Sequence, residues 1–102
     1  MSTMGSRADL SELLHTFADN VYFQPPNNLQ MKYPCIVYKD STPSVRRANN
    51  NLYLNVRRYT ITVIDKRPES PIVDGIAKLS MCTVTGFFVT DNLNHTTLDL
   101  YF

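Results

Sequence analysis

Tryptophan is absent from this 102-residue chain, and glycine and cysteine are scarce, with three and two residues respectively. So few glycines argue against a Walker loop or a G-x-G-x-x-G turn, and neither motif occurs. Two cysteines are too few for the disulfide framework of a small secreted protein. No run approaches the roughly twenty apolar residues that span a bilayer, and the opening MSTMGSR lacks the apolar core of a secretion signal. We therefore expect a protein that stays soluble in the cell that makes it and enters no membrane.

The composition is that of an ordinary globular protein, with 43% hydrophobic and 19% charged residues. A chain of this length is too short to divide into two stable cores, so residues 1–102 are expected to form one domain. Residues 1–6 are expected to be flexible. The formal net charge of +1 gives no long-range reason to expect tight binding to nucleic acid or membranes.

Two helices are predicted. Leu10, Leu13, Leu14 and Phe17 recur at the spacing of one helical face, which indicates a helix from about residue 7 to residue 18. The second begins at Ser70-Pro71, an N-cap followed by the favoured first helical residue, and runs to about Leu79. Strands are predicted at 21–23, 34–39, 52–65, 83–89 and 96–102, with a hairpin loop at 90–95. This order indicates an α+β fold with the helices on one face of the sheet.

Two segments stand out in this scheme. Residues 40–51 are rich in Ser, Pro, Arg and Asn, and they are predicted to form a long exposed loop. The chain ends in the apolar run Leu98 to Phe102, whose open edge would invite aggregation, so this strand must be paired within the domain or by another subunit. Pairing within the domain is the favoured alternative.

Catalysis and metal binding have few candidate residues. A nucleophile with a base would require Cys35 or Cys82 beside His95, and neither cysteine sits in a recognised catalytic motif. His15 is expected to be a surface or packing residue of the first helix, and His95 to make a local hydrogen bond near Asp91 in the hairpin loop. The four residues show no metal-ligand spacing. We expect no enzyme activity, no catalytic or metal-binding residue and no cofactor.

One region is strongly basic. Five basic residues face the single acid Asp40 within twenty residues: Lys39, Arg46, Arg47, Arg57 and Arg58. The simplest interpretation is that these basic residues lie in a solvent-exposed loop and sheet edge. Alternatively, the arginines bind carboxylates of a neighbouring subunit or face DNA phosphates. A nucleic-acid-binding module would use Tyr53 or Tyr59 as a stacking platform.

Several motifs occur in a characteristic order along the chain. They are Tyr33 to Tyr38 (YPCIVY), Arg58 to Asp65 (RYTITVID), Leu79 to Cys82 (LSMC), and Thr90 to His95 (TDNLNH) followed by Leu98 to Tyr101 (LDLY). This series resembles the tail terminator proteins of long-tailed bacteriophages, also called tail-completion or head-tail joining proteins. The likeness extends from about Leu10 to the last residue, and it rests on the order and spacing of the motifs together.

The resemblance implies one mixed, mainly antiparallel sheet with two helices on one face. It also implies a homo-oligomeric ring, hexameric in that family, that caps the tail tube, ends its polymerisation and joins it to the head-side connector. The protein would belong to the tail and neck of the virion after assembly in the host cytoplasm, and DNA would pass through its lumen. Another neck component, such as a head-completion or connector protein, is the nearest alternative.

A ring needs two unlike contact surfaces on each subunit. The candidate residues for one surface are the basic set Arg46, Arg47, Arg57 and Arg58. Carboxylates such as Asp74, Asp91 or Asp99 are candidates for the other.

Overall fold

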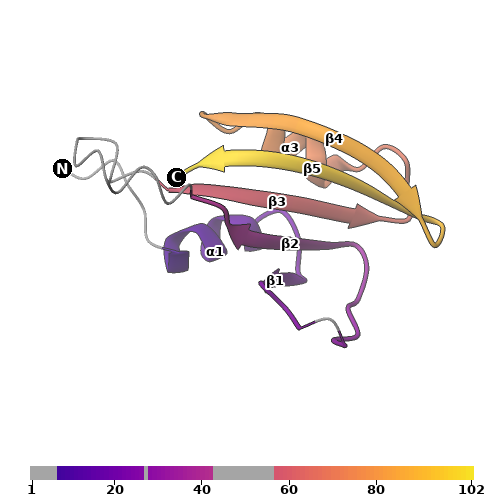
Figure 1. The fold of residues 1–102 in the computed structure, drawn as a ribbon. Helices are drawn as coiled ribbons and strands as arrows, with labels where there is room; N and C mark the ends of the chain where they lie inside the picture. Colours follow the sequence, from indigo (N-terminus) through magenta and orange to yellow (C-terminus); the bar gives the residue numbers. More distant parts are fainter. Residues whose placement is uncertain (1–6, 27, 43–56) are drawn as a thin grey trace.

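A computed structural model of the protein describes residues 7–26, 28–42 and 57–102, and it has the α+β fold that the sequence predicts (Figure 1). Five strands form one sheet, and two helices accompany it. The elements in chain order are α1 (Arg7–His15), β1 (Val21–Phe23), β2 (Cys35–Asp40), β3 (Arg58–Asp65), α3 (Pro71–Ala77), β4 (Cys82–Thr90) and β5 (Leu93–Tyr101).

The sheet is mixed and mainly antiparallel. The strand order is β1-β2-β3-β5-β4, in which only the β1–β2 pair is parallel. The C-terminal strand β5 therefore lies inside the sheet, between β3 and β4, and both of its edges are paired. This confirms the expectation that the apolar end of the chain is paired within the domain. The strand β4 is left at one edge of the sheet.

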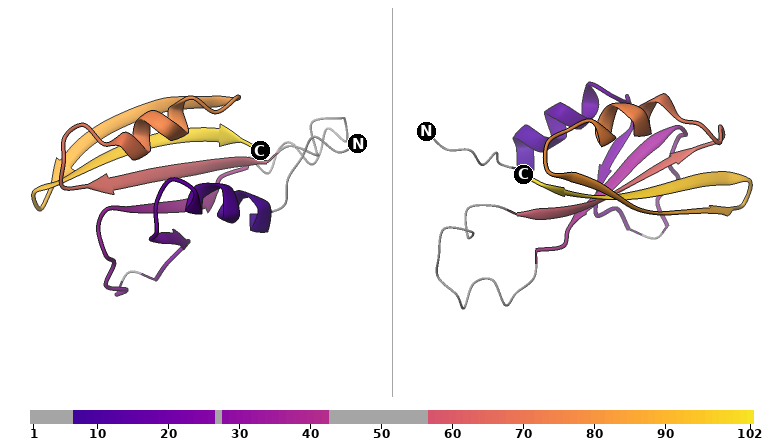
Figure 2. Two further views of the ribbon diagram at one scale, coloured as in Figure 1. Left: turned by 180° about the vertical axis from the view of Figure 1, so that it is seen from behind. Right: turned by 90° about the horizontal axis from the view of Figure 1, so that it is seen from above.

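Both helices cover the same face of the sheet, as the right-hand view of Figure 2 shows. Apolar side chains alternate toward this face along β3, where Tyr59, Ile61 and Val63 are buried. Leu10 and Leu14 of α1 are fully buried against the sheet, and Ile72 and Ile76 of α3 join the same core. Because the two helices cover this face, the sheet can contact other molecules only through its opposite face and its edges.

The helix ends differ slightly from the sequence prediction. The helix α1 ends at His15 instead of residue 18, because the amides of Thr16 and Phe17 bond to carbonyls three residues back and tighten the last turn. The Phe17 ring nevertheless packs on the core. The predicted cap of α3 is confirmed, since the Ser70 hydroxyl accepts a hydrogen bond of 3.3 Å from the Ile72 amide. This helix ends at Ala77, two residues before the predicted end.

The predicted hairpin between the last two strands is confirmed, but its loop is shorter than the predicted 90–95. The strands β4 and β5 meet at a two-residue turn, Asp91-Asn92, whose φ angles of 53° and 63° are left-handed. Asp and Asn tolerate this region better than most residues do, and two such residues in succession form the type I′ turn that suits the twist of a hairpin. His95 consequently lies within β5, paired with Phe88.

The predicted loop at 40–51 begins too early. Asp40 is the last residue of β2 and pairs with Tyr59, because the β2–β3 ladder continues past the last apolar residue. Residues 43–51 of that loop lie outside the described residues, as do residues 52–56 of the strand predicted at 52–65. Arg46, Arg47 and Tyr53 belong to this part of the chain.

Candidate functional site: an unpaired edge strand

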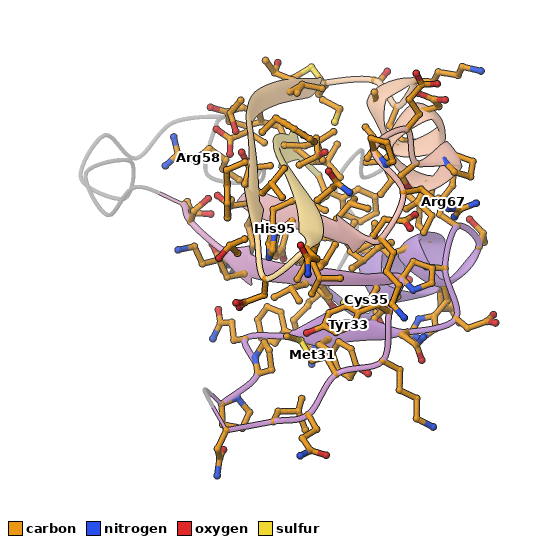
Figure 3. All side chains as sticks on the ribbon, turned by 90° about the vertical axis from the view of Figure 1, so that its right-hand side faces the viewer. Met31, Tyr33, Cys35, Arg58, Arg67 and His95 are labelled. Atoms are coloured by element: carbon orange, nitrogen blue, oxygen red, sulfur yellow. The ribbon has the colours of Figure 1, made fainter. Side chains whose placement is uncertain are left out.

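The candidate nucleophiles and bases do not meet. Cys82 packs against the core on the helix face, whereas His95 lies on the opposite face, where its ring stacks on Phe88. Cys35 shares the face of His95, but Ile64 of β3 stands between them, so two strand spacings, roughly 10 Å, separate their backbones. Burial raises the pKa of the Cys35 thiol to about 11, which keeps it protonated at neutral pH. Figure 3 shows Cys35 beside Tyr33.

The two histidines make local contacts. The His15 ring nitrogen Nδ1 lies 2.8 Å from the Ser11 carbonyl oxygen on the exposed side of α1, in agreement with its expected surface role. The His95 Nδ1 lies 3.1 Å from the Leu93 carbonyl oxygen. The expected local hydrogen bond of His95 is therefore confirmed, but its partner is the Leu93 backbone within β5. The described residues contain no group of three or more His, Cys, Asp or Glu side chains suited to a metal ion.

The two described arginines of the basic region are bonded to residues of their own domain. The Arg57 Nη1 donates to Asp40 Oδ2 at 3.2 Å. Burial would raise the pKa of Asp40, but hydrogen bonds from Thr42 and Arg57 outweigh it and hold the pKa below its ordinary value. Arg58 donates from Nη2 to the Ser41 carbonyl at 2.8 Å and from Nε to the Ser41 hydroxyl at 3.2 Å. Both arginines thus brace the end of β2 against the start of β3.

The predicted acidic residues occupy two different places. Asp99 accepts a hydrogen bond of 3.2 Å from the Thr60 hydroxyl and lies two residue pairs from Arg58 in the β3–β5 ladder. Asp91 is exposed in the hairpin turn, and eight residues of β5 separate that end of the sheet from the partner of Arg58, roughly 26 Å at the usual rise. The structure therefore places Asp91, but not Asp99, away from Arg57 and Arg58. Asp74 is exposed on α3.

Tyr59 is buried, with 2% of its surface exposed, so it offers no stacking platform for a base. That part of the nucleic-acid interpretation is wrong, because Tyr59 lies on the face of β3 that the helices cover. Its ring packs edge-on against Tyr38, with 6.1 Å between ring centroids.

Sequence reasoning missed the free edge of β4, which pairs with no other strand among the described residues. This edge strand has nine residues, Cys82 to Thr90, and none is charged or a proline. Edge strands of monomeric proteins are usually short or protected by charges or proline. Large apolar side chains lie exposed along it: Phe87 at 55%, Phe88 at 49% and Val89 at 58%, with Val84 and Met81 before them. The absence of charge over nine residues was visible in the sequence, but its meaning depended on which strand is at the edge.

A groove of about 510 Å³ lies on the face without helices, between β2, β3 and the segment that follows β1. Pro25, Pro26, Leu29 and Met31 form one wall. The other wall consists of side chains that alternate with the core residues, including Val37, Lys39 and Thr62. Its polar groups are an exposed Lys39 and hydroxyl or amide groups, which do not form an acid–base pair.

Comparisons with protein-family models, with curated proteins and with solved structures find no match to this chain. None of the helices in the described ranges has the length and apolar character needed to cross a bilayer. The candidate site is therefore defined by geometry and composition, as an uncharged edge strand with exposed apolar side chains.

Proposed function

We propose that this chain is a structural virion protein of a phage tail. It forms a ring, hexameric by analogy with the tail terminators that its motifs resemble, which caps the tail tube, ends tube polymerisation and joins the tail to the head-side connector. The partners are copies of the chain, the tail tube protein and the connector, and DNA passes through the lumen. The ring belongs to the neck of the virion and assembles in the host cytoplasm.

The free edge of β4 is the observation that supports this proposal best. A strand edge presents unpaired backbone N–H and C=O groups, and exposed apolar side chains beside them add area that gains free energy when another protein covers it. An exposed edge of this kind does not stabilise a monomer. In an assembly, the same backbone groups and apolar side chains form contacts with the neighbouring subunit.

The placement of chemically reactive groups adds to the case. The thiol of Cys35 is buried, Cys82 and His95 lie on opposite faces, and Arg57 and Arg58 are bonded to residues of their own domain. Asp91 projects from the opposite end of the sheet, where Lys66 and Arg67 follow β3, so Arg57 and Arg58 lie at one end of each subunit and this exposed carboxylate at the other. Arginines and a carboxylate at different ends are candidates for the two contact surfaces of a ring.

Electron microscopy of particles assembled without this chain tests the proposal. A terminator predicts tail tubes that grow beyond the normal length, since nothing caps them. Tails of normal length detached from filled heads would instead identify a connector or head-completion protein. Normal, infectious particles would contradict both roles. The double variant Arg46→Glu, Arg47→Glu tests the basic surface in the same assay, and unaltered tail length would remove that surface from the proposal.

A further inference from the structure

We infer that the free protein forms a two-fold dimer in which β4 pairs antiparallel with β4 of a second copy, joining two five-stranded sheets into one. This goes beyond the proposed ring, whose head-to-tail contacts are of a different kind, and it does not depend on a role in phage. It concerns the form of the protein before it meets any other partner.

The hairpin fixes which groups of β4 face outward. In a two-residue hairpin, Thr90 and Leu93 bond to each other, and the bonded pairs then alternate along the ladder. Phe88, paired with His95, therefore directs its backbone groups toward β5, whereas Phe87 and Val89 direct theirs outward. An outward row of alternating donors and acceptors is completed only by another extended strand, so the occupant must be a strand.

Composition indicates that this strand is a second β4. No residue from Cys82 to Thr90 is charged, so two copies meet without repulsion, and a charged partner strand would find no complement here. In an antiparallel pair, the edge of one β4 is also complementary to the same edge of the second copy. If the two-fold axis passes at Phe88, Phe87 lies opposite Val89 of the second copy, and Phe88 lies opposite its own equivalent.

An irregularity in the β4–β5 pairing supports this register of the β4–β4 contact. The β4–β5 pairing shifts between Val84 and Gly86, and a bulge twists the edge and interrupts pairing there. Residues Gly86 to Thr90 form an unbroken run after the bulge, centred on Phe88. The stacked ring of His95, 4.6 Å away, holds Phe88 on the face without helices, so its ring is presented in one orientation. The three large apolar residues exposed in this run, Phe87, Phe88 and Val89, are thus the three that the dimer would cover.

Sedimentation velocity of the full chain over a range of concentrations tests the dimer. We expect a species of twice the 11.7 kDa chain mass, and we expect Val89→Lys to shift it to the monomer while circular dichroism stays unchanged. Leu29→Lys, at a 40% exposed apolar residue on the other side of the molecule, is the matched control and should remain dimeric. A wild-type monomer at every concentration, or a dimer that Val89→Lys leaves intact, would overturn the inference.

Cross-linking gives an answer even if the lysine variant fails to fold. In a Cys82→Ser background, Phe88→Cys should form an intermolecular disulfide on mild oxidation, because directly opposed residues of a non-bonded antiparallel pair bring their Cβ atoms within disulfide range. Thr83→Cys, also exposed on β4 but before the bulge, should not cross-link. The reverse pattern, or equal cross-linking of both, would contradict the proposed register and the dimer with it.

Discussion

Phe88 and His95 face each other across the β4–β5 pair with their ring centroids 4.6 Å apart and their planes inclined by 13°. The contact is a stack on the face without helices, at the free edge of the sheet. It explains why a histidine with no catalytic partner among the described residues is nevertheless held in place. The stack gives the edge strand a rigid aromatic surface.

Replacing His95 should therefore weaken the domain. We expect His95→Ala to lower the free energy of unfolding by about 0.5–1.5 kcal/mol, the usual strength of an aromatic pair beyond its buried area. Urea denaturation followed by circular dichroism measures this. His15→Ala, on the exposed side of α1, is the control and should change stability by less. Equal effects of the two substitutions would show that the stack contributes nothing.

Tyr38 carries a buried hydroxyl with no hydrogen-bond partner among the residues that the structure describes. An unsatisfied buried polar group costs free energy, whereas the ring itself packs well, 4.9 Å from Phe23 between centroids. We expect Tyr38→Phe to raise the free energy of unfolding by about 1 kcal/mol. Tyr38→Ala, which also removes the ring, should lower it by about 3–5 kcal/mol. If Tyr38→Phe destabilises the protein in thermal denaturation, the hydroxyl has a partner and this account of it is wrong.

Asp65 is buried at the end of β3 and accepts hydrogen bonds from Arg67 Nη2 at 2.9 Å, Arg67 Nε at 3.2 Å and the Arg67 amide at 3.0 Å. Burial alone would raise the pKa of Asp65, but the bonds from Arg67 and Ser70 outweigh it and lower the pKa below its ordinary value of 3.8. A depressed carboxyl pKa stabilises the fold above the ordinary value. That stability is lost as the pH falls below 3.8 through the folded-state pKa.

We therefore expect Asp65→Asn to lower the free energy of unfolding by about 1.5–3 kcal/mol at neutral pH, the range for hydrogen bonds to a charged group. The difference from wild type should shrink as the pH falls below 3.8. Urea unfolding measured from pH 7 to pH 3 provides the test. The matched control is Asp19→Asn, at an exposed carboxyl. A wild-type-like variant at pH 7 would exclude the proposed role of Asp65.

Gly75 in α3 marks the close approach of the two helical segments. A Cβ atom at this position would lie 2.7 Å from Phe17 Cδ1 and 2.8 Å from Cε1. Alanine normally stabilises a helix relative to glycine by about 1 kcal/mol, but overpacking costs about 1–3 kcal/mol. We expect Gly75→Ala to be destabilising by about 1 kcal/mol in thermal denaturation. Combining it with Phe17→Leu should remove the clash, and strictly additive losses in the double variant would contradict this explanation.

The sequence predicted the parts of the fold where periodicity and local chemistry agree. The strand predicted at 52–65 contains β3, and Ser70 marked the start of α3. The hairpin itself was predicted, but its loop was predicted too long, because the Asp91-Asn92 turn lacks the glycine that usually marks a type I′ turn and the residues around it are polar. A local sequence pattern of this kind does not show where a turn begins and ends.

The candidate site was harder to predict from the sequence than the fold. Charge density drew attention to Arg57 and Arg58, but their bonds to Asp40 and Ser41 depend on long-range pairing of β2 with β3. The exposure of Phe87 follows only from the strand order, which places β5 inside the sheet and leaves β4 at its edge. Strand order is set by tertiary contacts that no local pattern in a single sequence encodes.

Amide hydrogen exchange along β4 tests most directly whether this chain works by contact with copies of itself. Outward amides of an edge strand exchange fast unless a second strand covers them. If β4 is the self-contact, the amides of Phe87 and Val89 should exchange more slowly as the protein concentration rises, while those of Phe88 and His95, already bonded within the hairpin, change little. Exchange of Phe87 and Val89 that is fast and independent of concentration would contradict the claim.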